Sequence, residues 1–240
     1  MLSDRQIQIV KAIVEEYTDT GEAVGSHTLD TKYRLGVSPA TLRNEMAELE
    51  NKGFLSKPHT SAGRIPTSTA IRFYVNELMK ERALSVAEEV AIKQRVWDHR
   101  SDSRNLLKEA THVLAERTKT LSIAAIDNGD VYHAGYSNLL STSEFYDIDL
   151  FREVLAILDE QSRLFDLFHR AVSDEPIHLL VGDEMGYTRL QPVSCLFADI
   201  QIGQHRGSFG IIASNRQHYE QSIPMVRYIA NLINQLAQTV

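Results

Sequence analysis

The segment that decides the fold spans residues 38–67, SPATLRNEMAELENKGFLSKPHTSAGRIPT. Ser38 is a favourable helix N-cap, and Pro39 suits the first helical position. One face of the predicted helix then carries an apolar stripe, formed by Leu42, Met46 and Leu49. Gly53 ends this helix. The remaining residues predict two short strands, FLS and GRIPT, on either side of a polar loop at 57–63.

Two helices are expected before this segment. Ser3 and Gln6 form a capping box at the start of the first helix, and Gly21 ends it. A short helix follows at about 26–33, and the residues RLGV at 34–37 make a tight turn. Helix, helix, tight turn, capped helix and hairpin is the element order of a winged helix-turn-helix.

The charge of the chain is distributed unevenly. The 240 residues are 43% hydrophobic and 24% charged, as in an ordinary globular protein, and the net charge is -7. Residues 1–82 contain eleven basic and eleven acidic residues, so the excess of acid lies entirely in 83–240. Within 32–72, seven basic residues accompany three acidic ones. A local positive excess of this kind is expected of a DNA-binding module.

The rest of the chain predicts an α+β fold. Strand-like runs occur at 121–126, 130–136, 177–182, 194–202 and 207–214. The first two are joined by DNG, which favours a hairpin turn. Helical patterns cover about 69–79, 86–119, two runs after a cap at Asp147 or Asp149, and 223–239. We therefore expect a DNA-binding domain at 1–80, a helical linker at 81–119 that can also pair with a partner chain, and a sheet domain at 120–240.

Several classes of function have no support in the sequence. The single cysteine, Cys195, cannot form an intramolecular disulfide, and a reducing cytoplasm is expected. No run of 18 apolar residues predicts a membrane span, and no signal-peptide pattern opens the chain. The nine histidines lack metal-ligand spacing, and the Gly-rich stretch at 203–210 lies between strands, which indicates a turn. We expect no metal, no cofactor and no enzymatic activity.

The helix at 38–52 has the pattern of a recognition helix. Its polar face carries Ala40, Thr41, Asn44 and Glu48, with Arg43 at its side. A helix fits the major groove of DNA, where asparagine can pair with adenine and arginine with guanine or phosphate. The alternative is an amphipathic helix whose polar face is only solvated.

The loop after this helix is interpreted as a wing. Arg64 is expected at an exposed loop tip, from which it can enter a narrow minor groove, and Gly63 allows close approach. Thr60 and Ser61 can bind phosphate. The alternative is a plain hairpin turn with a solvated arginine. The candidate DNA-contacting residues are Lys32, Ser38, Thr41, Arg43, Asn44, Lys57, His59, Thr60, Ser61, Gly63, Arg64 and Arg72.

Three stretches resemble one protein family, the heat-inducible transcription repressors HrcA. The most specific is VSPATLRNEMAELENKGFLSKPHTSAGRIPTSTAIRFYV at 37–75. Two further stretches match more loosely, GYSNLLSTSEF at 135–145 and GSFGIIASNRQHYEQSIPMVRYIANLI at 207–233. The resemblance implies a winged-helix domain, a GAF-like domain and a homodimer that binds an inverted-repeat operator upstream of chaperone genes. It further implies that a GroEL-type chaperonin keeps the repressor active until heat diverts the chaperonin to unfolded proteins.

The chain departs from this family in length. Family members are usually longer, and here the residues after the predicted linker lead almost directly into the late GAF-like region, so the GAF-like domain at 120–240 is truncated. The inserted dimerisation segment is missing, so the helices at 86–119 or the sheet domain would have to supply the dimer interface. A second hypothesis is a winged-helix regulator controlled by a small molecule held in the GAF-like domain.

Overall fold

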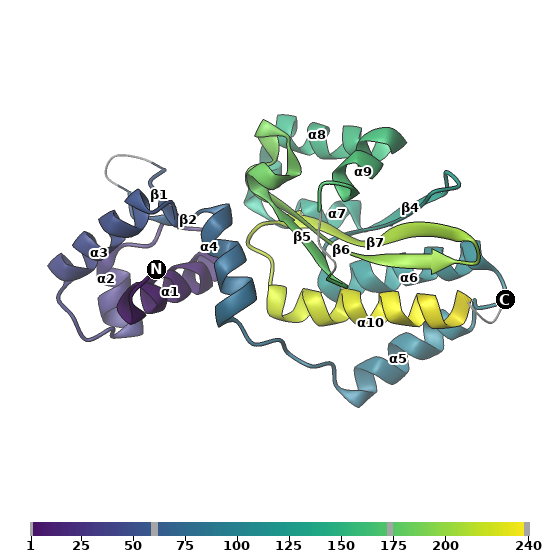
Figure 1. Ribbon diagram of the computed structural model, residues 1–240, viewed down its shortest axis with the longest axis horizontal. Coiled ribbons are helices and arrows are strands. Elements are labelled where there is room, and N and C mark those ends of the chain that lie inside the picture. Colours follow the sequence, from purple (N-terminus) through teal and green to yellow (C-terminus); the bar gives the residue numbers. More distant parts are fainter. Residues whose placement is uncertain (1, 59–61, 172–174, 238–240) are drawn as a thin grey trace. The chain divides into compact units, whose positions relative to one another are not determined.

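The structure, a computed structural model, describes residues 2–58, 62–171 and 175–237, and it divides into two compact units, Met1–Lys80 and Glu81–Val240. The helices of the first unit are α1 (Asp4–Thr20), α2 (Ser26–Thr28), the π-helical η1 (Leu29–Tyr33), α3 (Pro39–Asn51), α4 (Ser68–Phe73) and the π-helical η2 (Tyr74–Leu78). Strands β1 (Leu55–Ser56) and β2 (Ile65–Pro66) pair antiparallel between α3 and α4 (Figure 1).

Local signals account for the ends of the first helix. The Ser3 hydroxyl accepts a hydrogen bond from the Gln6 amide at 3.3 Å, and the Gln6 side chain accepts one from the Ser3 amide at 3.3 Å. At the other end, Gly21 adopts φ 71°, a left-handed conformation that glycine tolerates best. The capping box and the helix end predicted from the sequence are therefore confirmed.

The first unit has its own apolar core. Fully buried side chains come from α1, η1 and α3: Ile9, Val10, Ile13, Leu29, Leu42 and Leu49. They interlock because each helix carries its apolar residues at three- and four-residue spacing, which places them on one face. The β1–β2 pair adds Leu55, which is 2% exposed.

The second unit is built on a five-stranded antiparallel sheet with strand order β4-β3-β7-β6-β5. The strands are β3 (Leu121–Ile126), β4 (Val131–Ala134), β5 (His178–Val181), β6 (Val193–Ile202) and β7 (His205–Ser214). The helices are α5 (Val86–Trp97), α6 (Ser103–Thr118), α7 (Tyr136–Leu139), α8 (Ile148–Asp159), α9 (Gln161–Phe168) and α10 (Tyr219–Ala237), with 3-10 turns η3 (Ser143–Tyr146), η4 (Gly182–Met185) and η5 (Thr188–Leu190). This arrangement confirms the α+β class.

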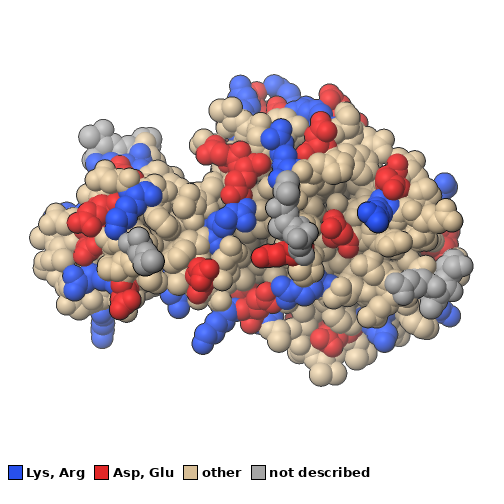
Figure 2. Space-filling model, in the orientation of Figure 1, with Lys and Arg blue, Asp and Glu red and all other residues tan. Residues whose placement is uncertain are grey.

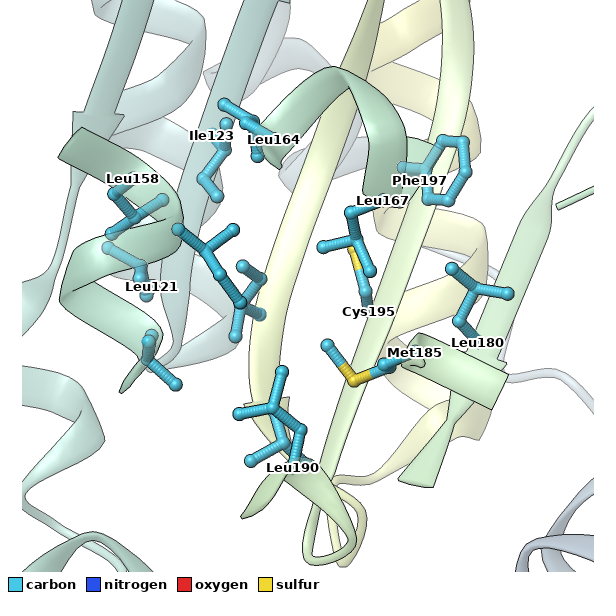
Figure 3. Packing of buried hydrophobic residues seen from close by; sticks show 14 of the residues in the cluster. Leu121, Ile123, Leu158, Leu164, Leu167, Leu180, Met185, Leu190, Cys195 and Phe197 are labelled. Carbon is cyan, nitrogen blue, oxygen red and sulfur yellow. The ribbon is translucent and has the colours of Figure 1, made fainter. Parts of the chain in front are cut away.

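Helices cover both faces of the sheet. Helix α10 packs against β6 and α6 against β3 on one face, while α8 and α9 lie over the other (Figure 1). The face beneath α8 and α9 holds a dense cluster, and Figure 3 shows Cys195 and Phe197 of β6 pointing toward Leu167 of α9. Alternate residues of β3, such as Leu121 and Ile123, enter the same cluster because side chains alternate across a strand.

The helices at 81–119 lie within the second unit, although the sequence suggested a separate linker. Helix α6 packs against β3, β4 and α10, and Leu106, Ala110 and Leu114 are fully buried there. An apolar stripe of this width requires a packed partner, which the sheet provides. None of the helices in the described ranges combines the length and the apolar character that a membrane span requires.

Candidate nucleic-acid interface

Helix α3 exposes one face because its other face is committed to the core. Leu42 and Leu49 are fully buried, and Met46 is 4% exposed. The start of the helix is fixed by Ser38, whose hydroxyl accepts a hydrogen bond from the Thr41 amide at 3.2 Å. The predicted cap and apolar stripe are thereby confirmed, and the rotation of the helix about its axis follows from them.

The exposed face of α3 is longer than the sequence analysis suggested. The residues of this helix that are exposed are Ala40, Arg43, Asn44, Ala47, Glu48 and Asn51. Within the described part of the chain, the side chains of Arg43 and Asn44 have no hydrogen-bond or ion-pair partner, so both are available to a ligand. Ala47 and Asn51 were missed, although they continue the spacing of Ala40 and Asn44 along the same face.

Gln6 of α1 joins α1 to the side of α3, and sequence reasoning did not find this role. Its side-chain nitrogen donates to Glu45 Oε2 and to Glu48 Oε2, both at 3.0 Å, and its Oε1 accepts from Lys52 Nζ at 2.8 Å. Gln6 is 3% exposed, so these bonds lie at a packed junction. Glu48, expected on the free polar face, is therefore held toward α1.

The loop between β1 and β2 is described only in part. Lys57 is exposed at the end of β1, without a side-chain partner among the described residues. His59, Thr60 and Ser61, proposed to contact phosphate, lie outside the described residues. The β1–β2 pair itself is confirmed, with Leu55 opposite Pro66 in the register.

Gly63 is required by a contact inside the protein. A Cβ atom at this position would lie 2.4 Å from the backbone oxygen of Val24, far inside van der Waals contact. The chain at Val24 passes this close because it forms an antiparallel bridge with Arg64, with N–O distances of 2.8 and 2.9 Å. Close approach of two backbones therefore explains this glycine without DNA.

The expectation that Arg64 sits at an exposed loop tip is wrong. Its side chain is 16% exposed, and Arg64 Nη2 lies 2.8 Å from Glu50 Oε2 near the end of α3. Its backbone is held by the Val24 bridge. The sequence did not reveal these partners of Arg64, because the acid lies on the preceding helix and the backbone partner, Val24, lies before α2.

Lys32, expected as a free phosphate anchor, is paired within the first unit. Lys32 Nζ lies 2.5 Å from Glu16 Oε2, and Tyr33 donates a hydrogen bond to the same oxygen at 3.0 Å. The hydrogen bond from Lys32, supported by that from Tyr33, holds the pKa of Glu16 below its usual value. Burial and the neighbouring carboxylate raise the pKa of Tyr33. Arg72, another expected anchor, is half-buried on α4.

The charge pattern is mixed at the surface. On the face shown in Figure 2, basic and acidic side chains are interspersed over the first unit. Among the basic residues in 32–72, Lys32 is engaged with Glu16 and Arg64 with Glu50. The net positive excess of this segment therefore overstates the charge that is free to meet a phosphate.

The second unit contains an open cleft of about 990 Å³ beside the end of α9. Aromatic side chains, Phe165, Phe168 and Phe197, form part of its lining. Polar groups meet them there: His178 Nε2 lies 3.2 Å from Asp199 Oδ2, and Arg206 lines the same cleft. A cavity that combines aromatic surface with a few polar groups is of the kind that holds small molecules.

Comparison with known proteins identifies the family. Residues 50–223 match the family model described as HrcA protein C terminal domain. The heat-inducible transcription repressor HrcA of Ruminiclostridium cellulolyticum is 27% identical over 338 aligned positions, which cover 98% of this chain and 97% of that protein. The alignment is longer than the 240 residues of the chain, so the relative has segments without a counterpart here.

A second relative and one solved structure extend this result. The HrcA repressor of Clostridium perfringens is 47% identical over 124 residues, which cover 51% of this chain and 37% of that protein. A crystal structure described as a hypothetical protein has a TM-score of 0.76 at 18% identity and covers 100% of this chain and 99% of its own, a likeness in fold alone. Because the family model matches most of its length, the chain belongs to the HrcA family, whose curated relatives are heat-inducible transcription repressors and not enzymes.

Proposed function

We propose that this protein is a transcription repressor that binds an inverted-repeat DNA operator as a homodimer, through a winged-helix first unit. The observation that carries the proposal is the exposed face of α3. This face projects Arg43 and Asn44 from the amino-terminal half of a helix whose opposite face is buried. The β1–β2 hairpin follows this helix directly, as a wing follows a recognition helix.

In this proposal α3 enters the major groove. Asn44 is suited to adenine, which offers a donor and an acceptor side by side, and Arg43 to guanine or a phosphate. The hydroxyls of Ser38 and Thr41 lie 3.0 Å apart at the same helix end, where either can bond a phosphate. The small side chains of Ala40 and Ala47 leave room for the helix to approach the base edges.

The hairpin supplies contacts to the backbone beside the groove. Lys57 is an exposed cation at its base, and His59, Thr60, Ser61 and Gly63 belong to the same loop. Lys32 and Arg72 are further candidates for phosphate contact. Arg64 enters the proposal as the residue that holds the hairpin to α3, because it would have to leave Glu50 before it could reach a groove.

Two copies related by a two-fold axis would read half-sites one or two helical turns apart. Heat would release the operator by weakening the second unit or the dimer contact. A GroEL-type chaperonin is the proposed partner that maintains the active repressor. Membership of a family of heat-inducible repressors supports this regulation.

Binding to DNA tests the proposal directly. We expect tight binding, by fluorescence anisotropy, to an inverted repeat from upstream of chaperone genes, and weak binding to a scrambled duplex of the same composition. Lys57→Ala should weaken binding to both duplexes and reduce the slope of log K against log salt by about 1. Lys11→Ala, an equal charge change on α1, is the matched control. Equal affinity for both duplexes would refute sequence-specific repression.

The cleft supports a second function, control of DNA binding by a small molecule. The combination of aromatic rings with Arg206 and His178 suits a small aromatic acid. A panel of such acids should then raise the melting temperature of the second unit and change operator affinity. Arg206→Gln should abolish both effects. If no member of the panel changes either quantity, the ligand-controlled function is excluded for this class of compounds.

A further inference from the structure

Helix α5 is apolar on two sides. Ile92 and Val96 are fully buried against the second unit. On the other side, Val86 is 76% exposed, Val90 58% and Trp97 43%. Val90 lies four residues after Val86, and Trp97 lies seven residues after Val90. This spacing places the three side chains in one stripe along the outer face of the helix. We call Val86, Val90 and Trp97 the outer stripe.

The outer stripe is presented on a helix that is held firmly in place. Ser85 and Glu88 form a capping box at its start, where the Ser85 amide donates to Glu88 Oε2 at 2.8 Å. Arg95 donates to Glu109 Oε1 at 2.6 and 2.9 Å and to Glu116 Oε2 at 2.7 Å, which ties α5 to α6. An apolar surface that is fixed in this way cannot be hidden by a small rotation of the helix.

The charges beside the outer stripe are self-complementary. Glu89 and Lys93 lie along one edge of it, one helical turn apart, and neither forms an ion pair within the described ranges. When two copies of a helix pack antiparallel about a two-fold axis, the same edge of each helix meets its copy. Glu89 of one copy then faces Lys93 of the other, twice.

We propose that the outer stripe is a self-association surface, on which a second copy of this chain packs its own α5 antiparallel. Val86 of one copy meets Trp97 of the other, and Val90 lies near the two-fold axis. Arg100 completes the end of the contact, because its guanidinium lies 4.5 Å from the centre of the Trp97 ring. The inference rests on the proposed homodimer and gives it an interface.

The length of α5 sets the strength expected of this contact. A helix of 12 residues is about 18 Å long, so the paired helices bury an area at the low end of specific interfaces. We expect a dissociation constant in the micromolar range without DNA. Binding of both half-sites of one operator holds the two copies together and compensates for the weak contact.

Sedimentation velocity over a range of concentrations tests the surface. Val90→Glu places a charge in the outer stripe and should weaken dimerisation more than tenfold. Ile148→Glu is the matched control, because Ile148 is 64% exposed at the start of α8 in the same unit. If Val90→Glu dimerises as tightly as the unmodified protein, the α5 interface is wrong and the dimeric repressor stands. If the unmodified protein stays monomeric and does not bind the operator, both the α5 interface and the dimeric repressor are wrong.

Charge exchange and cross-linking test the antiparallel geometry. Glu89→Lys and Lys93→Glu should each prevent self-association, while an equimolar mixture of the two should form a heterodimer. Under oxidation, Val90→Cys should form a cross-linked dimer, and Val86→Cys should not, because two copies of residue 86 lie about 16 Å apart along antiparallel helices. Cys195 does not interfere, since it is 1% exposed. Equal cross-linking at both positions would exclude the antiparallel arrangement.

Discussion

Arg64 Nη2 lies 2.8 Å from Glu50 Oε2, so the hairpin after α3 is tied to the end of that helix by an ion pair. This relationship gives opposite predictions for two roles of Arg64. If Arg64 holds the hairpin, Glu50→Gln should weaken operator binding, as should Arg64→Ala. If Arg64 instead contacts DNA, Glu50→Gln removes a competing acid and should tighten binding.

We expect the first outcome, with a loss of stability on the order of 1 kcal/mol for either substitution. Anisotropy with the operator and urea unfolding of the same samples measure both quantities. A double-mutant cycle between the two positions should show coupling of similar size in folding and in binding. Tighter operator binding by Glu50→Gln would show that Arg64 contacts DNA.

Arg43 and Asn44 should govern affinity for the operator without affecting stability. Each projects from α3 without a partner in the described structure, so removing the side chain breaks no contact within the protein. We expect Arg43→Ala and Asn44→Ala each to cost about 1–3 kcal/mol of operator binding and to relax preference at one base pair. Anisotropy against a series of single-base operator variants measures this. Uniform weakening across the series would indicate phosphate contact instead.

Gly63→Ala should destabilise the first unit. The new Cβ would lie 2.4 Å from the Val24 oxygen, so one of the two backbones must move, at a cost of about 1–3 kcal/mol. Gly25→Ala is the matched control, since a Cβ there meets nothing within 4 Å and its φ of -92° suits alanine. Thermal unfolding followed by circular dichroism compares the two. Equal stability of both variants would contradict the close contact at Gly63.

The ion pair between Glu144 and Arg216 should make the second unit sensitive to acid. Burial alone would raise the pKa of Glu144, but hydrogen bonds from Arg216, one of them from Nη2 at 3.0 Å, outweigh burial and hold it below its usual value. A folded pKa below the unfolded value of about 4.5 stabilises the protein above that pH, and this stability is lost as pH falls through the folded pKa.

Glu144→Gln should therefore cost about 2 kcal/mol at pH 7, and the difference from the unmodified protein should shrink below pH 4.5. Urea unfolding of both proteins at pH 7 and at a pH below 4.5 measures this difference in stability. Glu160→Gln serves as the control, because Glu160 is 62% exposed and 3.9 Å from Arg163. A difference that is unchanged between the two pH values would show that the charge of Glu144 contributes nothing.

Cys195 can report whether this protein senses heat by itself. Burial raises the pKa of its thiol and leaves it 1% exposed, so it should react with a thiol reagent only when the second unit opens. We expect purified protein to release the operator reversibly at the temperature where labelling of Cys195 begins. This temperature should lie below the temperature at which the first unit unfolds. Retention of the operator until all of the protein unfolds would place heat sensing in a partner such as a chaperonin.

Local signals made much of the fold predictable. The Ser3–Gln6 capping box, the Ser38 cap and the apolar stripe of α3 depend on residues within a few positions of each other. The hairpin strands were predictable for the same reason, since alternation and turn residues are local. The strand order of the sheet and the docking of α6 depend on partners far along the chain, which one sequence does not pair.

The candidate site divides in the same way. The exposure of Arg43 and Asn44 followed from the helical repeat. The engagement of Arg64 with Glu50 and the bonds from Gln6 to α3 did not, because each depends on where a distant side chain comes to rest. Gly63 was interpreted as room for DNA, whereas the neighbour that requires a glycine is Val24.

The β1–β2 pair and the bridge between Val24 and Arg64 hold both ends of the connection that joins the two strands of the hairpin. Changes in length or composition within residues 57–62 would therefore not be transmitted to α3. Evolution could diversify this connection while the helix stayed constant, and so retune operator preference in small steps. A protein engineer could use the same separation and randomise residues 57–62 in a library, keeping Gly63, without re-optimising the fold.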